Sequence, residues 1–429
     1  MIKRRSIEEK ISDYQPKLPI PVLYDLLRIG MRLYSWRNHI LCTYHFDPAI
    51  FHGKQVIVLA DHAVFNSFVP VIGRWRGSRL SIVTSSFFCS SYIGLLFCKM
   101  FSIIPKSSYE NDYRCMRQML TMLRLGASLL IFPEGMWSMS GSSMPLYPGT
   151  VSFLKGVKLP VILARSYGMY LSQPPYSMEK HKGHAELHYE VLFTPEELQE
   201  LDEETLYQKL LARFRYNDFE WNAQHHYRYK TKKGNAVGLE KLLYYCPCCG
   251  MEQMMRSERD DLFCTSCGNR IRVEDDYRLI PTPGCMLPYE NIDEWAKAQR
   301  RKVREEIESP DFFIEYDCRL YYSNPRSLNL TDHFIVAGEG HLRIDADGIR
   351  YRGTSKGQTV DFFFNAADTP SFYVTQDSRY NILADRGVWY RFEPLSHDVN
   401  LYKNRFAVEE IHNKIDPAWN RVSRDAYDI

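Results

Sequence analysis

The chain has 429 residues, a formal net charge of +2 and 25% charged residues. This length allows two or three domains with cores of their own. So balanced a charge argues neither for nor against nucleic acid as a partner. Five of the 11 cysteines fall between positions 246 and 267. That clustering favours a metal site in a reducing compartment over disulfides.

The amino-terminal region shows no export signal. Residues 1–5 include three basic side chains, but the stretch from Ser6 to Lys17 is mostly polar and charged. A secretion signal needs an apolar segment there, so we expect a cytoplasmic protein. The nearly uncharged run from Leu80 to Phe97 is rich in serine and predicts no membrane span.

The segment from Leu18 to Trp36 carries apolar residues at helical spacing, with Arg28 and Arg32 among them and Arg37 directly after. This pattern predicts an amphipathic helix with a basic edge. Such a helix can lie in a membrane interface, which would make the protein peripherally membrane-associated. It can equally pack on the domain that follows, and the pattern alone favours neither.

Residues 1–225 alternate between apolar strand patterns and helical patterns. The strands are predicted at 54–62, 80–83, 101–106, 128–132, 161–163 and 187–193. Helical patterns occur at 87–100, after the capping box Ser107-x-x-Glu110, and from Thr194 to about Phe214. Strands joined by helices of this length predict an α/β domain with a largely parallel, mixed sheet and crossover helices.

Two further modules are predicted after a linker at 226–241, which is polar, basic and glycine-containing. Residues 242–280 hold the cysteine cluster. Residues 281–429 begin with a helix and continue as short alternating strands that end in one helix, at 400–415. Successive hairpins followed by a helix resemble a pleckstrin-homology-like barrel, so a β-rich domain is expected here.

The cysteine cluster is predicted to bind zinc. Cys246 and Cys249, and then Cys264 and Cys267, form two Cys-x-x-Cys-Gly knuckles. Two thiolates from each knuckle complete a tetrahedral site, so we expect a structural zinc ribbon. A redox dithiol would not need the second pair. The arginines nearby are offset by acidic residues, so no nucleic-acid surface is expected.

Chemistry-bearing residues stand at four of the predicted strands. They are Asp61-His62, Ile103-Ile104-Pro105-Lys106, Phe132-Pro133-Glu134-Gly135 and Leu159-Pro160-Val161-Ile162. In order and spacing, these blocks resemble the four sequence blocks of the glycerolipid acyltransferases, the family of lysophosphatidic acid acyltransferases. The resemblance covers about residues 40–215 and implies the fold of that family for the first domain.

The resemblance implies acyl transfer from a thioester donor, acyl-CoA or acyl-carrier protein, to a hydroxylated lipid acceptor at a membrane surface. His62 would be the general base that takes the acceptor's proton, with Asp61 and Ser67 beside it in the catalytic block. Donor and acceptor would be bound together. The acceptor pocket would be shaped by residues of the later blocks, namely Lys106, Phe132, Pro133, Glu134, Gly135, Trp137 and Ser138.

Three positions depart from the family pattern. The first block is normally Asn-His-x-Ser-x-x-Asp, but Ser67 stands where the aspartate that orients the histidine is expected. Ser67 or Asn66 could bond the imidazole instead, or Asp61 could turn inward. Lys106 and Trp137 stand in place of two arginines, and an indole cannot clamp a phosphate.

Two functions therefore remain open. One is an acyltransferase of lipid metabolism whose acceptor is a glycerolipid, a sugar, an amino-lipid or another hydroxylated molecule. The other is a catalytically degenerate acyltransferase fold that serves as a lipid-binding or scaffolding protein. The serine at position 67 and the tryptophan at position 137 motivate this second function, because both replace charged residues of the family's site.

Overall fold

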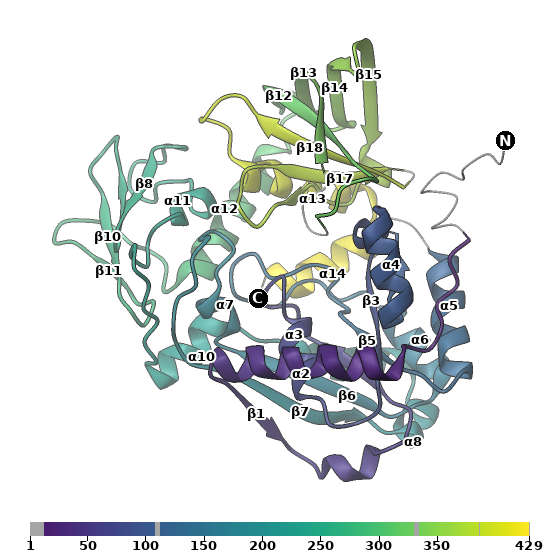
Figure 1. Ribbon diagram of the computed structural model, residues 1–429. Coiled ribbons are helices and arrows are strands. Elements are labelled where there is room, and N and C mark those ends of the chain that lie inside the picture. The colour runs from purple at the N-terminus through teal and green to yellow at the C-terminus, as the bar shows by residue number, and fades with distance from the viewer. Residues whose placement is uncertain (1–12, 108–111, 330–333, 386, 429) are drawn as a thin grey trace.

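The computed structural model describes residues 13–107, 112–329, 334–385 and 387–428 (Figure 1). Two expectations fall outside these ranges: most of the polar stretch near the amino terminus, and the Glu110 partner of the capping box. The helix after that box, α5 (Tyr113–Arg124), is capped by Asp112, whose side chain accepts from the Cys115 N–H. No described helix is long and apolar enough to cross a bilayer.

Seven strands in the first half of the chain form one sheet, in the order β1-β7-β6-β2-β5-β3-β4. They are β1 (Ile40–Tyr44), β2 (Ile57–Ala60), β3 (Leu80–Ser85), β4 (Ile104–Lys106), β5 (Ser128–Ile131), β6 (Val161–Tyr167) and β7 (Ala185–Phe193). All neighbouring pairs are parallel except β6 and β7. The mixed, parallel-rich α/β sheet is therefore confirmed. Sequence reasoning missed β1, a short edge strand in which only Ile40 is buried.

The strands that precede His62 and Glu134 lie side by side within this sheet. β2 pairs with β5 on one side and with β6 on the other, so that Ile57 lies opposite both Leu129 and Val161. Ile57 has no exposed surface, as expected for a strand with a continuous apolar sequence. Because β2 and β5 are parallel, His62 and Glu134 emerge at the same edge of the sheet.

Helices pack on both faces of the sheet. Ile57 and Leu59 of β2 belong to one core cluster, and Val58 and Ala60 belong to another. The helices of the first cluster are α5, α6 (Gly149–Val157), α8 (Pro195–Glu200) and α9 (Glu203–Phe214). Those of the second cluster are α2 (Pro21–Arg37), α3 (Phe68–Arg74) and α7 (Met169–Ser172). Figure 1 shows α2, the predicted amphipathic helix, lying across the front of the sheet.

Between β3 and β4 the chain forms η2 (Ser86–Cys89) and α4 (Tyr92–Phe101). Cys89 and Cys98 are fully buried there and form a disulfide. Sequence reasoning, which favoured a metal site over disulfides for the clustered cysteines, did not predict this pair. Its two cysteines lie outside the conspicuous cluster, and only the turn from η2 into α4 brings their side chains together.

The cysteine cluster lies in a four-stranded antiparallel sheet, in the order β11-β10-β9-β8. Its strands are β8 (Met255–Glu258), β9 (Asp261–Cys264), β10 (Arg270–Val273) and β11 (Leu279–Pro281). The preceding segment, expected as a linker at 226–241, is packed against its neighbours. It includes the start of α11 (Leu239–Leu242), and both Tyr229 and Leu239 have no exposed surface.

Seven antiparallel strands form a third sheet, in the order β15-β14-β13-β12-β18-β17-β16. They are β12 (Ile314–Ser323), β13 (Phe334–Asp345), β14 (Gly348–Ser355), β15 (Gln358–Asn365), β16 (Tyr373–Val374), β17 (Asn381–Asp385) and β18 (Val388–Pro394). The expected β-rich carboxyl-terminal module is therefore confirmed. Two helices follow it rather than one, α13 (Leu401–Ile415) and α14 (Pro417–Tyr427).

Helix α12 (Ile292–Glu306) connects the cysteine-bearing sheet with the third sheet. Its Trp295 indole donates to the carbonyl oxygen of Tyr245, the residue before the first zinc-knuckle cysteine. Further along α12, Arg300 forms buried ion pairs with Glu409 and Glu410 of α13. Through these two contacts α12 joins the cysteine-bearing sheet to α13, which follows the third sheet.

Candidate active site and metal centre

His62 follows the buried strand β2, and both of its main-chain polar groups are held. Its N–H donates to Oε2 of Glu134 at 2.6 Å, and its carbonyl oxygen accepts from the Ser138 N–H at 2.8 Å. Glu134 and Ser138 both belong to the segment after β5. Residues predicted from two blocks that are 72 positions apart are therefore in direct contact.

The imidazole of His62 is oriented by a backbone carbonyl. Nδ1 lies 3.0 Å from the carbonyl oxygen of Val64. A carbonyl oxygen can only accept, so Nδ1 carries the hydrogen of the neutral ring and Nε2 keeps its lone pair. Nε2 has no hydrogen-bond partner among the described residues. Burial lowers the pKa of His62 to about 4, which the bond to Val64 offsets only in part. At neutral pH the ring is therefore uncharged and able to accept a proton at Nε2.

Aromatic side chains lie beside the imidazole. The ring centroid of Phe132 is 4.7 Å from that of His62, and the ring of Trp137 meets His62 edge-on at 6.2 Å. Phe65 in turn packs against Trp137 at 5.6 Å. Such surroundings favour a hydrocarbon chain or a neutral ring next to His62 and disfavour a phosphate, because a buried anion needs a charged or hydrogen-bonding partner.

Glu134 supports the main chain around His62. Its carboxyl group is only 8% exposed, and besides the His62 N–H it accepts from the Met144 N–H, at 2.8 Å. Burial and the negative charge of Asp61 raise the pKa of Glu134 to about 7, and the two N–H donors act in the opposite direction. The carboxyl group thus connects two loops at the sheet edge.

None of the three residues considered as orienting partners bonds the imidazole. Asp61 is fully enclosed, and its two oxygens accept from the N–H and the hydroxyl of Ser166. Asn66 donates to a tyrosine hydroxyl on α2. The Ser67 hydroxyl donates at 2.8 Å to the carbonyl oxygen of Val64, the same atom that receives Nδ1 of the imidazole. Sequence reasoning missed Val64, because a backbone acceptor leaves no signature in residue identity.

The remaining predicted residues separate into two groups. Pro133 and Gly135 form the turn between β5 and the segment that contacts His62, with Gly135 in the left-handed region at a φ of 70°. Lys106, in contrast, lies at the exposed end of β4, the edge strand of the sheet, where its amine donates to the Ser107 carbonyl oxygen. The structure brings Glu134, Trp137 and Ser138 to His62 but leaves Lys106 at the rim.

Sequence reasoning also missed a row of aromatic rings that leads from this site to the third sheet. Phe65 packs against Phe88 at 5.9 Å, and Phe88 against Phe87 at the same distance. Phe87 contacts Phe334 of β13 at 5.4 Å and Trp389 of β18 at 5.3 Å. In the sequence, nothing about the apolar residues of η2 indicates that they contact aromatic rings more than 240 positions away.

The four predicted metal ligands converge. Their sulfur atoms lie within 4.8 Å of one another, with 3.7 Å between Cys246 and Cys267 and 3.8 Å between Cys249 and Cys264. Tetrahedral zinc with bonds of about 2.3 Å to sulfur requires sulfur atoms about 3.8 Å apart. The glycine after each knuckle has a positive φ, of 75° and 77°, as the turn toward the ion requires. The residues therefore fit a structural zinc ion.

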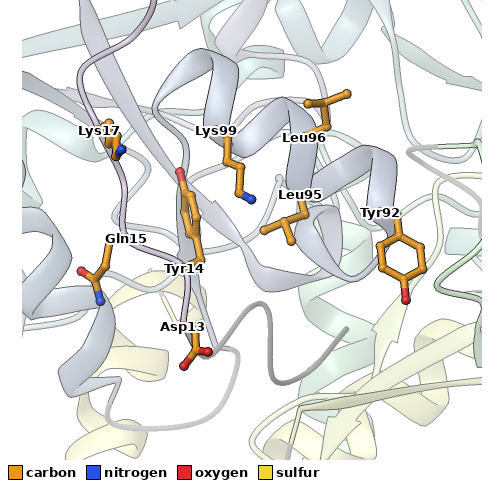
Figure 2. A pocket seen from close by; sticks show the side chains of 8 residues that line it. All are labelled: Asp13, Tyr14, Gln15, Lys17, Tyr92, Leu95, Leu96 and Lys99. Carbon is orange, nitrogen blue, oxygen red and sulfur yellow. The ribbon is translucent and has the colours of Figure 1, made fainter. Parts of the chain in front are cut away.

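A cavity of about 850 Å³ lies elsewhere, between the amino-terminal segment and α4 (Figure 2). Tyr14, Leu95 and Lys99 are among the residues that line it. The Tyr14 hydroxyl donates to the carbonyl oxygens of Cys98 and Ile103, which fixes this segment on α4. None of the residues predicted for acyl transfer lines this cavity.

Comparison with known proteins shows a distant structural similarity. No protein-family model matches the chain, and no curated protein matches it. Among solved structures, the chain is similar to the 1-acyl-sn-glycerophosphate (LPA) acyltransferase PlsC from Thermotoga maritima, with 13% sequence identity and a TM-score of 0.37. The matched region covers 48% of this chain and 83% of that one.

Proposed function

We propose that this protein is an acyltransferase that moves a fatty acyl group from a thioester to the hydroxyl group of a lipid-like acceptor, with His62 as general base. The observation that carries this proposal is the state of the imidazole. It is uncharged at neutral pH, its Nδ1 is bound to Val64, and its Nε2 is without a hydrogen-bond partner among the described residues. A base prepared in this way requires only an acceptor hydroxyl within reach.

The reaction follows from these groups. Nε2 of His62 accepts the proton of the acceptor hydroxyl as the oxygen attacks the thioester carbonyl carbon. The carbon–oxygen bond forms, the carbon–sulfur bond breaks, and the departing thiolate takes the proton back from the imidazolium. Ester and free thiol are the products, and no covalent enzyme intermediate is needed. The donor is acyl-CoA or an acyl-carrier protein, bound together with the acceptor.

The surroundings of His62 narrow the class of acceptor. Phe132 and Trp137 supply apolar surface next to the base, whereas Lys106, the cation of the second block, stands at the rim of the sheet. We propose that the acceptor presents a neutral portion, such as a sugar ring or an acyl-bearing glycerol, to Trp137. A phosphate, if the acceptor carries one, would lie toward Lys106.

The test compares two histidines, His62 and His181, whose pKa values are both lowered by burial. Burial lowers the pKa of His181 to about 4 as well, but His181 bonds Tyr277 on the cysteine-bearing side of the molecule. His62→Gln should reduce thioester release with a panel of hydroxylated lipid acceptors by about 100-fold or more, as loss of a general base does. His181→Gln should retain the activity.

Two results would contradict this proposal. Unchanged activity in His62→Gln would reject His62 as the base. If the unmodified protein binds acyl lipids without releasing thiol from any donor, the second function, a lipid-binding or scaffolding role for this fold, takes its place. The engagement of Asp61 by Ser166 favours that second function, because the carboxylate next to His62 in the sequence then does not bond the imidazole.

A further inference from the structure

One buried carboxylate fastens the segment after β5 to α12. We call residues 134–147 the Glu134 loop. Oδ1 of Asp293, in the first turn of α12, accepts from the hydroxyl of Ser140 at 2.5 Å and from that of Ser142 at 2.7 Å. Asp293 is 1% exposed, so both bonds are shielded from water. They join parts of the chain that are more than 150 positions apart.

The second oxygen of Asp293 is also satisfied. Oδ2 accepts from the Asn217 side chain and from the Lys297 amine, each at 3.0 Å. Four donors, one of them a cation, offset the cost of burying a carboxylate, and the amino-terminal end of α12 favours its negative charge further. Asp293 is therefore a rigid anchor for the Glu134 loop.

The anchored serines connect to His62 within a few bonds. The Ser138 hydroxyl donates to the carbonyl oxygen of Ser142 at 2.6 Å and accepts from the Gly141 N–H at 3.0 Å. The Ser138 N–H then donates to the carbonyl oxygen of His62. Gly141 stands at a φ of 92°, a conformation that other residues resist, so the turn is closely defined.

The same loop holds His62 a second time. Met144 and His62 both donate their N–H groups to the carboxyl group of Glu134. A displacement of the Glu134 loop would therefore disturb both polar groups of the His62 main chain. The ring depends on that main chain, because its own acceptor, the carbonyl oxygen of Val64, lies only two residues away.

We propose that Asp293 is a positioning residue for His62 and acts through Ser140 and Ser142 of the Glu134 loop. The inference rests on the proposed function, in which His62 is the base. It assigns part of the active site to the carboxyl-terminal half of the chain, outside the region that resembles the acyltransferases. When the loop is released, Ser138 moves from the His62 carbonyl oxygen and water reaches the ring. A displacement of about 1 Å can lower a rate by about 100-fold.

The experiment first removes the two serine hydroxyls that donate to Asp293, and then changes the carboxylate that accepts from them. The double variant Ser140→Ala/Ser142→Ala deletes both hydroxyls and leaves Asp293 bound to Asn217 and Lys297. Asp293→Asn keeps the shape of the side chain, but one carboxylate oxygen becomes an NH₂ group. That group then faces donors of the same kind, such as the serine hydroxyls or the Lys297 amine. If the double variant does not fold, each single serine variant retains one of the two bonds and replaces it in the comparison.

A control is available in the loop before β16. The Ser371 hydroxyl donates to the buried carboxylate of Glu409 in α13 at 2.6 Å, the same kind of bond away from the Glu134 loop. Ser371→Ala removes one such bond, so it should lower the thermal stability by about as much as Ser140→Ala or Ser142→Ala alone. It should leave the kcat of acyl transfer and the titration of His62 unchanged.

Two measurements decide the outcome. In the double variant and in Asp293→Asn we expect kcat to fall by about 10-fold to 100-fold with the acceptor KM unchanged. By NMR of labelled histidine, we expect the pKa of His62 to rise toward its ordinary value as water enters. Wild-type values of both quantities, together with a loss of stability like that of Ser371→Ala, would overturn the inference.

The NMR titration also separates the two proposals. If the unmodified protein transfers no acyl group, the proposed function fails and kcat carries no information. The pKa of His62 in the serine variants then still shows whether Asp293 holds the ring in place. An unchanged value there would overturn the positioning role independently.

Discussion

The Val64 carbonyl oxygen bonds Nδ1 of His62, where the resemblance to the glycerolipid acyltransferases implies a carboxylate. Both acceptors select the same tautomer, with hydrogen on Nδ1 and a lone pair on Nε2. They differ in charge, because a carbonyl stabilises an imidazolium less than a carboxylate does. In the proposed reaction His62 is therefore a correctly oriented but weak base, with its pKa lowered to about 4 by burial. Slow turnover is the expected consequence.

The pH dependence of acyl transfer should reveal this weak base. The rate should fall as the pH decreases through about 4, where Nε2 becomes protonated. Glu134, whose pKa is about 7, accepts from the His62 N–H, so its protonation should add a smaller step near neutral pH. An inflection near pH 6.5 that persists in Glu134→Gln would instead indicate a solvent-exposed imidazole.

The same shift has a consequence for stability. The unfolded chain protonates His62 below about pH 6.5, whereas the folded protein resists protonation down to about 4. The contribution of His62 to the free energy of unfolding should therefore decrease as the pH falls across that window, whereas Glu134, with its raised pKa, contributes in the opposite direction. In His62→Gln the contribution of this residue to the decrease should be absent, which denaturant titrations at several pH values can measure.

At the scale of elements, α2 has an apolar face that no described residue covers. Val22, Leu26, Ile29, Leu33 and Trp36 recur at spacings of three and four residues, and each exposes more than half of its surface. The opposite face packs on α3 and the sheet, through residues such as Tyr24. The packed alternative is therefore confirmed for one side of the helix, and the free side leaves the membrane interface as a prediction.

Basic residues border that apolar face. Arg32 and Arg37 are exposed, and Arg28 shares Asp25 with Arg79. A row of apolar side chains with cations beside it is typical of a helix that lies in the interface of an anionic bilayer. We propose that α2 holds the protein at a membrane that contains its acceptor.

Substitution on α2 tests this membrane contact. Leu26→Glu and Leu33→Glu should each weaken binding to vesicles of phosphatidylcholine and phosphatidylglycerol by about 10-fold, because each removes a leucine from the interface. Met178→Glu adds the same charge at an equally exposed apolar residue outside α2. Equal vesicle binding by all three variants in a sedimentation assay would exclude α2 as the contact.

At the scale of the whole molecule, the carboxyl-terminal half is built into the candidate active site. Asp293 holds the Glu134 loop, the ring of Trp419 in α14 packs on Tyr147 at the end of that loop, and Phe87 contacts the third sheet. The domain boundaries expected at residues 225, 241 and 280 therefore stay a proposal. They separate the three sheets along the chain, but the sheets are joined by buried contacts in the folded protein.

Removal of the metal should destabilise α12 as well as the predicted zinc ribbon. Purified protein should contain about one zinc per chain, and Cys264→Ser should lose it and lower Tm by about 10 °C or more. The change should extend to α12, because the main chain of Tyr245 bonds Trp295 and Gln299 of that helix. Cys248 lies outside the predicted ligand set, so Cys248→Ser should retain both metal and Tm. Full zinc content in Cys264→Ser would contradict the four-cysteine site.

Local sequence specified the features that depend on neighbours within a few residues. The continuous apolar run before His62 specified a buried strand, and the glycine-ended cysteine pairs specified two knuckles of a metal site. The parallel order of the strands then followed from helices of crossover length, which placed His62 and Glu134 at one edge. These inferences needed only side-chain polarity, spacing and turn chemistry.

Other features arise only when distant segments meet. The acceptor of Nδ1 is a main-chain oxygen, the partner of Asp61 is a serine 105 residues away, and the anchor of the Glu134 loop lies in α12. Residue identity does not encode such pairings, because a serine or a buried carboxylate has many partners of equal chemistry. The packing of the three sheets and α12 against one another determines which of these partners a given side chain meets. It also shields the resulting hydrogen bonds from water.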